Sequence, residues 1–174
     1  MGIQFETDYN METLTAMAKG LRKTVRKKRS RRVHIFAAVV LILGLLTILA
    51  TTAGGEPLGA SGVVTLLAML VVILVSLFED KLNAWFARKR LLPGTEHAVA
   101  TFEEDGYVSA TGVTESRFSY AQIVAVAETA RYFVFALSSH HTQAYDKRTI
   151  RGGSVEDFRA FIAEKTGKLV ENIK

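Results

Sequence analysis

The residues most suited to chemistry are histidines, serines and acidic side chains that lie at scattered positions. Two adjacent histidines, His140 and His141, follow directly after Ser138 and Ser139. Neighbouring residues of a strand point to opposite faces, so this pair is better interpreted as a polar turn than as two ligands of one metal ion. The acidic segment Glu103–Asp105 is expected at the tip of a hairpin, where carboxylates are normally solvated. Adjacency of serine and histidine does not by itself make a catalytic triad.

The residue content of the chain excludes several further kinds of active site. The chain has no Cys among its 174 residues, which excludes disulfides, thiolate metal sites and a cysteine nucleophile. His97 begins an expected strand and has no obvious carboxylate partner in the sequence. We find no glycine-rich phosphate loop and no nucleophile elbow. We therefore predict that the protein is not an enzyme and that it uses no cofactor, metal or catalytic residue.

Positive charge is concentrated in one segment. The net charge is +5, yet residues 19–32 carry nine basic and no acidic residues. This run ends where an apolar stretch begins at Val33, and bases beside a membrane span stay on its cytoplasmic side. They also attract anionic lipid headgroups, at about 1 kcal/mol per base. The residues predicted to set topology or bind such lipid are Arg22, Lys23, Arg26, Lys27, Lys28, Arg29, Arg31, Arg32, Arg88, Lys89 and Arg90.

The basic run fits nucleic-acid binding and a signal peptide less well. Nucleic-acid binding lacks a stacking platform, because the nearest aromatic residues are Tyr9 and Phe36. A signal peptide would have a basic region extending more than thirty residues into the chain, and it would be followed by a second apolar run. We therefore expect no nucleic-acid partner.

Two apolar stretches organise the chain, 33–52 and 58–78, and neither contains Asp, Glu, Lys or Arg. A helix of about twenty residues is roughly 30 Å long, which matches the hydrocarbon core of a bilayer. The connection Ala53–Pro57 is short, and both outer flanks are basic. We predict a multi-pass protein of the cell membrane with two spans and with both termini in the cytoplasm. Small residues (Ala37, Ala38 and Gly44) leave a homo-oligomer open.

The N-terminal segment is predicted to be a strand and then one long helix. Residues Ile3–Thr7 alternate apolar and polar side chains, and Asp8 or Asn10 is a suitable helix cap. Gly20 costs a helix only about 1 kcal/mol, so we expect a continuous helix from about Thr13 to about Thr52. Because both termini are expected in the cytoplasm, the strand is predicted to add to the sheet that follows Pro93.

Beyond Pro93-Gly94, about six short strands and one helix indicate a small α+β domain. Gly106 is expected to supply a positive φ in the first hairpin. The sequence Ser154-Val155-Glu156-Asp157 resembles a capping box, and Gly167 marks the end of the helix. The expected strands are 97–102, 107–111, a short one near Phe118, 123–129, 131–137 and 142–145.

The predicted fold class is an α+β membrane protein with four regions. Residues 1–32 form an N-terminal strand and basic cytoplasmic helix, and 33–78 form the transmembrane hairpin. Residues 79–94 are a juxtamembrane helix extension and linker. Residues 95–174 form a cytoplasmic domain whose antiparallel sheet is closed by the C-terminal helix.

The regions follow one another as an acidic-flanked strand, a basic helix, a two-span hairpin and a small sheet domain. The sheet domain carries Gly112, then Ser119-Tyr120-x-x-Ile123-x-x-Val126-x-Glu128-Thr129, an aromatic strand, Lys147-Arg148 and the helix 155–165. With these features the chain resembles, over nearly its whole length, the YcxB-like family of small bacterial membrane proteins. The resemblance implies a pleckstrin-homology-like (PH-like) domain in the cytoplasm, with no established activity. Asp146 stands where a proline is expected before Lys147-Arg148, and we interpret this basic pair as a solvated strand end.

Two functions are consistent with these features. The first is a non-enzymatic, membrane-anchored binding or regulatory module that docks a protein or a lipid headgroup. The alternative is an accessory subunit or oligomeric component of a membrane transport system. Neither apolar stretch carries an acidic residue, Lys or Arg, the usual mark of ion transport within a span.

The basic run generates a testable prediction. A peptide of residues 19–32 should bind vesicles that contain anionic lipid and should be released as salt rises, because salt screens the attraction. Vesicle co-sedimentation measures this binding. Equal binding to vesicles of neutral lipid would leave the run with a topological role alone.

Overall fold

The computed structural model describes residues 2–55 and 57–173, which divide into two compact units. The helical unit runs from Lys28 to Leu82, and the folded unit combines the N-terminal residues up to Lys27 with the residues from Asn83 onward. Helices and strands are both present, so the predicted α+β class is confirmed. The folded unit is therefore assembled from two segments that the helical unit separates in sequence.

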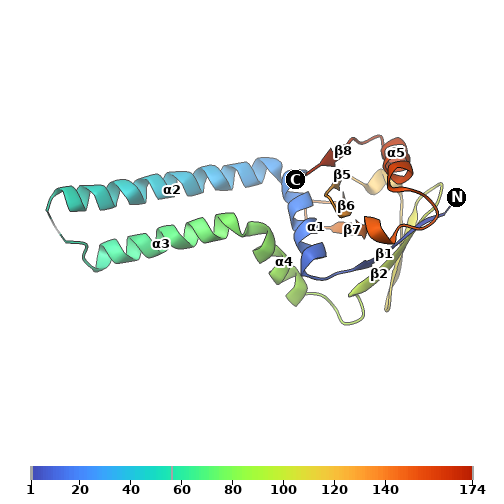
Figure 1. Ribbon diagram of the computed structural model, residues 1–174, viewed down its shortest axis with the longest axis horizontal. Coiled ribbons are helices and arrows are strands. Elements are labelled where there is room, and N and C mark those ends of the chain that lie inside the picture. The colour runs from blue at the N-terminus through green and yellow to red at the C-terminus, as the bar shows by residue number, and fades with distance from the viewer. Residues whose placement is uncertain (1, 56, 174) are drawn as a thin grey trace. The chain divides into compact units, whose positions relative to one another are not determined.

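The helical unit is a hairpin of two long helices, α2 (Lys27–Ala53) and α3 (Ala60–Leu77) (Figure 1). Both are long and apolar enough to cross a membrane, and their most apolar stretches are not buried in the protein. The two helices approach closely at Gly44, where an added Cβ would lie 2.8 Å from the Met69 Sδ. Gly44, one of the small residues considered for contacts between copies, is therefore used within the hairpin.

The prediction of one continuous helix from Thr13 to Thr52 is wrong. Helix α1 (Met11–Lys23) ends before α2 begins, and the chain turns at residues 24–26. Thr24 leaves helical geometry at φ −105° and ψ −92°, and its Oγ1 donates a hydrogen bond to the Gly20 carbonyl at 2.8 Å. The Arg26 amide then bonds to the Leu21 carbonyl, five residues back. No Pro lies at this break.

Helix α1 packs against the folded unit. Its N-cap is Asn10, one of the two predicted caps, whose side chain accepts hydrogen bonds from the amides of Glu12 and Thr13. Gly20 permits a close approach to strand β6, since an added Cβ would lie 2.7 Å from Val134 Cγ1. This glycine, which the sequence suggested only as a mild weakness of the helix, is thus a packing requirement.

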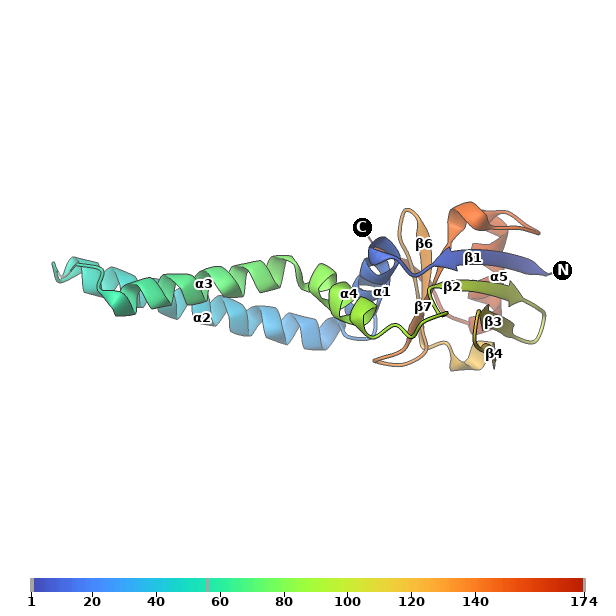
Figure 2. The same cartoon turned by 90° about the horizontal axis from the view of Figure 1, so that it is seen from below.

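Two four-stranded sheets form the body of the folded unit (Figure 2). The first is antiparallel and has the order β1-β2-β3-β4, with bounds Ile3–Asp8, His97–Phe102, Tyr107–Thr111 and Glu115–Phe118. The second has the order β7-β6-β5-β8, with bounds Thr142–Asp146, Tyr132–Ala136, Ala125–Glu128 and Val170–Asn172. The helices α4 (Glu79–Lys89) and α5 (Val155–Thr166) and two 3-10 turns, η1 (Tyr120–Gln122) and η2 (Lys147–Thr149), complete the elements.

The N-terminal strand joins the first sheet, as predicted. Strand β1 pairs antiparallel with β2 over its whole length, from Ile3 opposite Phe102 to Asp8 opposite His97. Its apolar residues Ile3 and Phe5 face inward, and Phe5 is fully buried. Residues on opposite sides of the helical hairpin in the sequence therefore share one core.

The core between the sheets is largely aromatic. Phe5 contacts the rings of Phe102, Phe133, Tyr145 and Phe158, with centroids 4.7–6.5 Å apart. Phe158 belongs to α5, so this helix contributes a buried ring to the core and covers it. One buried polar group is satisfied within the core: the Gln143 Oε1 accepts hydrogen bonds from the hydroxyls of Tyr107 and Tyr145, both at 2.7 Å.

Helix α5 begins and ends as its sequence predicts. Ser154 and Asp157 form a reciprocal capping box, and the Ser154 hydrogen bonds lower the pKa of the Asp157 carboxyl. Gly167 ends the helix in the left-handed conformation at φ 61°.

Two details of the strands differ from prediction. Gly106 does not have a positive φ, and glycine is needed there because a Cβ would lie 2.4 Å from the Phe118 carbonyl oxygen. Strand β8 lies outside the predicted strands, and it pairs in parallel with β5, so the second sheet is mixed rather than antiparallel. The three-residue β8 is too short to give a periodic signal.

The role of β1 can be tested by shortening its central side chain. Replacing Phe5 by Ala should lower the free energy of unfolding of the folded unit by about 3–5 kcal/mol, because it leaves a cavity among four aromatic rings. Chemical denaturation of the full chain, followed by near-ultraviolet circular dichroism, measures the change. The matched control is Gln4→Ala on the opposite face of the strand, expected within about 0.5 kcal/mol of the parent. Equal losses for both variants would contradict a core role for β1.

Candidate functional site

The predicted basic residues lie on four parts of the structure: α1, the turn after it, α2 and the end of α4. Arg22 and Lys23 end α1, Arg26 lies in the turn, five bases fill residues 27–32 of α2, and Arg88–Arg90 close α4. The exposed ones are Lys23, Lys27, Lys28, Arg29, Arg31, Arg32, Arg88, Lys89 and Arg90. Cations at a helix N-terminus oppose the helix dipole, and the first turn of α2 carries no acidic residue. The position of these bases therefore does not serve the stability of α2.

Arg26 has a different role from its neighbours. Its Nε donates to the Ser139 carbonyl at 2.6 Å, and its guanidinium also lies 2.8 Å from the His140 Nδ1. Both contacts are on the turn between β6 and β7, so Arg26 fastens the α1–α2 turn to the folded unit. This predicted lipid-binding residue is therefore engaged by the protein itself.

The turn that receives Arg26 is the polar turn that the sequence predicts. The amides of His140 and His141 both donate to the Ser138 Oγ, at 3.1 and 3.0 Å. The structure thus uses Ser138 to shape the turn rather than to face a histidine ring.

His97 does have a carboxylate partner, contrary to the sequence-based expectation. Its Nδ1 lies 2.7 Å from the Asp8 Oδ1. The two residues are directly opposite in the β1–β2 register, which the sequence alone does not reveal. Both side chains are more than half exposed, so this pair adds little to stability.

Two glutamates of the acidic hairpin tip form ion pairs with basic residues of other elements. Glu103 lies 3.2 Å from Arg117 on β4, and Glu104 lies 3.8 Å from Lys165 on α5. Within residues 2–55 and 57–173, no group of three or more His, Cys, Asp or Glu is placed to hold a metal ion.

The second sheet contains a buried carboxylate that sequence reasoning missed. Glu128 at the end of β5 is only 6% exposed at its side chain. It accepts hydrogen bonds from Lys147 at 2.8 Å and from the Arg159 guanidinium at 2.7 and 2.8 Å. The Arg159 hydrogen bond, more than any other contact, lowers the pKa of the Glu128 carboxyl. Arg159 belongs to α5, so this cluster joins helix and sheet.

Lys147 is therefore not the solvated strand end that the sequence predicts. Its ammonium is largely buried, and it also donates to the Thr129 carbonyl at 2.7 Å. The signal in the sequence was a charged residue, Glu128, at the end of an apolar strand. A buried carboxylate requires a cation, but the sequence does not say which one supplies it.

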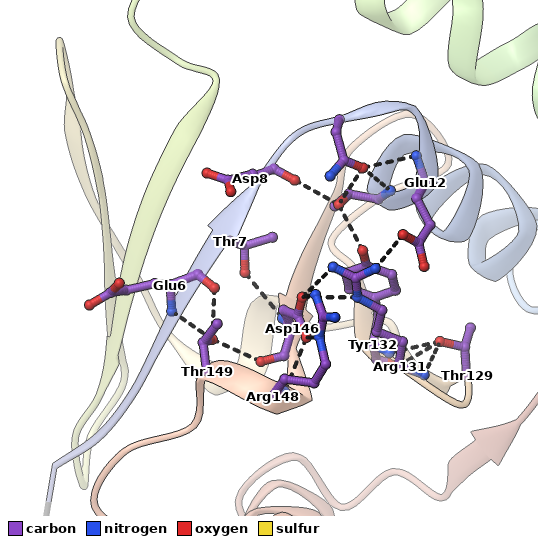
Figure 3. A network of polar contacts seen from close by, with 12 residues as sticks. Glu6, Thr7, Asp8, Glu12, Thr129, Arg131, Tyr132, Asp146, Arg148 and Thr149 are labelled. Carbon is purple, nitrogen blue, oxygen red and sulfur yellow. Dashed lines mark hydrogen bonds and ion pairs between the residues drawn. The ribbon is translucent and has the colours of Figure 1, made fainter.

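A second buried carboxylate, Asp146, lies at the end of β7 (Figure 3). Arg131 donates to its Oδ2 from two nitrogens at 3.0 Å each, and Arg148 donates to both carboxylate oxygens. Arg131 also pairs with Glu12 of α1. Asp146, which stands where the family resemblance led us to expect a proline, is thus the centre of an ion-pair network.

The same region holds the N-terminal strand. The Asp146 amide donates to the Thr7 Oγ1 at 3.1 Å, and the Thr149 Oγ1 exchanges hydrogen bonds with the Glu6 backbone at 2.7 and 3.0 Å (Figure 3). Strand β1 is therefore fixed on both of its edges, by β2 and by the segment after β7. These polar clusters hold the split folded unit together. The exposed bases of α2 and those of α4 are two separate groups of candidate binding residues.

Comparison with known families gives one match. Residues 102–162, which are 61 of the 174 residues, match the family model of the YcxB-like proteins. This confirms the family resemblance for the region from the end of β2 into α5, which is part of the length over which the sequence suggested it. The comparisons with curated proteins and with solved structures found no match.

The Glu128 cluster predicts a pH-dependent loss of stability. Glu128→Gln should lower the free energy of unfolding at neutral pH by about 3 kcal/mol, because it leaves two cations around a neutral group. The folded pKa of Glu128 lies below its ordinary value of 4.5. Its stabilising contribution is therefore complete above pH 4.5 and is lost as pH falls through the folded pKa, so the two proteins should converge in acid. Denaturant unfolding of both proteins at a series of pH values, from neutral pH to below pH 4.5, measures the difference.

A matched control contacts the same arginine. Glu156 lies 3.8 Å from Arg159 but is 76% exposed. Glu156→Gln should change the free energy of unfolding by less than about 1 kcal/mol, since exposed ion pairs contribute little. Equal effects of the two substitutions would show that burial of Glu128 does not matter.

Proposed function

We propose that this chain is a two-span protein of the cell membrane whose folded unit is a non-enzymatic binding or regulatory module in the cytoplasm. The observation that carries the proposal is the pairing of β1 with β2. Strand β1 precedes α2, and β2 follows α3. Two hydrogen-bonded strands must lie on one side of any membrane that the intervening helices cross, so two crossings are consistent with the fold and a single crossing is not.

The exposed bases support the orientation. Five cations stand at the start of α2 and three at the end of α4, while residues 33–52 and 58–78 have none. Bases at both outer flanks favour the cytoplasm for both termini, and they suit anionic headgroups as a partner. Attraction to anionic headgroups would offset the unfavourable interaction between the bases of α2 and the helix dipole.

The arrangement of the sheets supports a PH-like closure of the folded unit. Two four-stranded sheets enclose one aromatic core, and the C-terminal helix α5 inserts Phe158 among their rings. A domain closed in this way presents its loops and edges for binding, and its ligand is a protein or a lipid headgroup.

The buried carboxylates favour a structural role over general acid catalysis. A general acid at neutral pH needs a raised pKa, whereas the cations around Glu128 lower its pKa. The Asp146 carboxylate pairs with the guanidinium groups of Arg131 and Arg148. These groups are occupied in holding α1, β7 and α5 in place.

Cysteine labelling tests the topology, because the chain has no native Cys. Gly54→Cys, in the connection between α2 and α3, should react with a membrane-impermeant maleimide in intact cells. Asp105→Cys, at the exposed hairpin tip, should react only after the membrane is permeabilised. Position 105 is preferable to Gly106, where a Cβ would lie 2.4 Å from the Phe118 carbonyl oxygen. The reverse labelling pattern would refute the proposed orientation.

A further inference from the structure

Helix α4 has one buried side and one exposed aromatic side within the folded unit. Ala84 is fully buried, whereas Trp85 is 44% and Phe86 51% exposed. The two rings contact each other edge to face, with centroids 4.9 Å apart. Leu92, just beyond the helix, is 69% exposed. Exposed aromatic side chains that lie together in this way commonly mark an interaction surface.

The charged residues nearest to this aromatic pair in the sequence are all basic. The Lys89 Nζ lies 3.6 Å from the centroid of the Trp85 ring, and Arg88 and Arg90 are exposed beside it. From Lys81 to Thr95 the sequence contains no acidic residue. An aromatic pair with a cation over one ring and basic neighbours in the sequence is complementary to a surface that is apolar below and negatively charged above, which is the character of an anionic bilayer at its headgroups.

The position of α4 in the chain favours the same occupant. Trp85 follows Leu77, the last residue of α3, by eight residues. At 1.5 Å per residue, eight helical residues span at most about 12 Å. If α3 crosses the bilayer, Trp85 is held close to the headgroup region, where tryptophan is enriched in membrane proteins.

We propose that the surface formed by Trp85, Phe86 and Lys89 docks onto the boundary between headgroups and acyl chains of an anionic bilayer. This inference rests on the proposed membrane insertion of α2 and α3 and adds a third membrane-contacting element to it. The rings enter the boundary, and the Lys89 ammonium, which lies over the Trp85 ring, pairs with lipid phosphates. The folded unit is thereby held against the bilayer surface and is more than a freely tethered domain.

Trp85 is the only tryptophan of the chain and therefore reports its own surroundings. The full-length protein is reconstituted into vesicles that contain phosphatidylserine, together with lipids brominated either near the ester carbonyls or near the chain ends. We expect the bromines near the carbonyls to quench Trp85 emission strongly, and those near the chain ends to quench it less. Quenching should be weaker in vesicles of phosphatidylcholine alone.

Two relocated tryptophans provide the controls. In a Trp85→Phe background, Leu66→Trp places the reporter within α3, and it should be quenched most by bromines near the chain ends. Leu169→Trp places it at a side chain that is 89% exposed in the folded unit, and it should emit as in water. These variants separate insertion of the hairpin from docking of α4.

The outcomes distinguish the two proposals. If the tryptophan at position 66 is not quenched, the proposed membrane insertion itself fails. If it is quenched but Trp85 emits as in water, insertion stands and the docking of α4 is refuted. Protection of Trp85 from both brominated lipids and aqueous acrylamide would also refute it, because a protein surface would then cover the rings. Equal quenching in neutral and anionic vesicles would overturn the requirement for anionic lipid.

Discussion

The folded unit depends on the antiparallel pairing of β1 with β2. This pairing closes a loop of about ninety residues, and the cost of closure grows only slowly with loop length, so a long helical insertion is tolerated. The hydrogen bonds of the strand are supplemented by the burial of Phe5 among four aromatic rings. Without β1, the aromatic core would lose its central ring, and one edge of β2 would lack its partner.

The two buried carboxylates extend this dependence to the rest of the folded unit. Asp146 links β7 to Arg131, which in turn contacts Glu12 of α1, and Glu128 links β5 to Arg159 of α5. Each carboxylate contacts two cations, which compensates for its removal from water. Ion pairs of this kind are sensitive to the loss of one partner. They connect both helices to the sheet.

The exposed bases contrast with these internal pairs. Arg26 is bound by the turn between β6 and β7, whereas the bases of α2 and α4 are open to solvent. The basic run of residues 19–32 thus contains two kinds of residue. Arg26 is a structural anchor, and the exposed bases of α2 are cations able to contact an anionic surface. In α4, the exposed rings of Trp85 and Phe86 add apolar surface near the bases Arg88–Arg90.

Local patterns in the sequence were sufficient for much of this structure. The absence of charge indicated the two long apolar helices, and alternation indicated β1. Short apolar runs separated by turns indicated most of the remaining strands, and Ser154 with Asp157 indicated the start of α5. Each of these signals depends on residues close together in the chain. Tertiary structure decided the rest: the break at residues 24–26, the burial of Lys147 beside Glu128, the pairing of His97 with Asp8, and the parallel strand β8. These features depend on which distant segments meet and in what register, and a single sequence read locally does not contain that information.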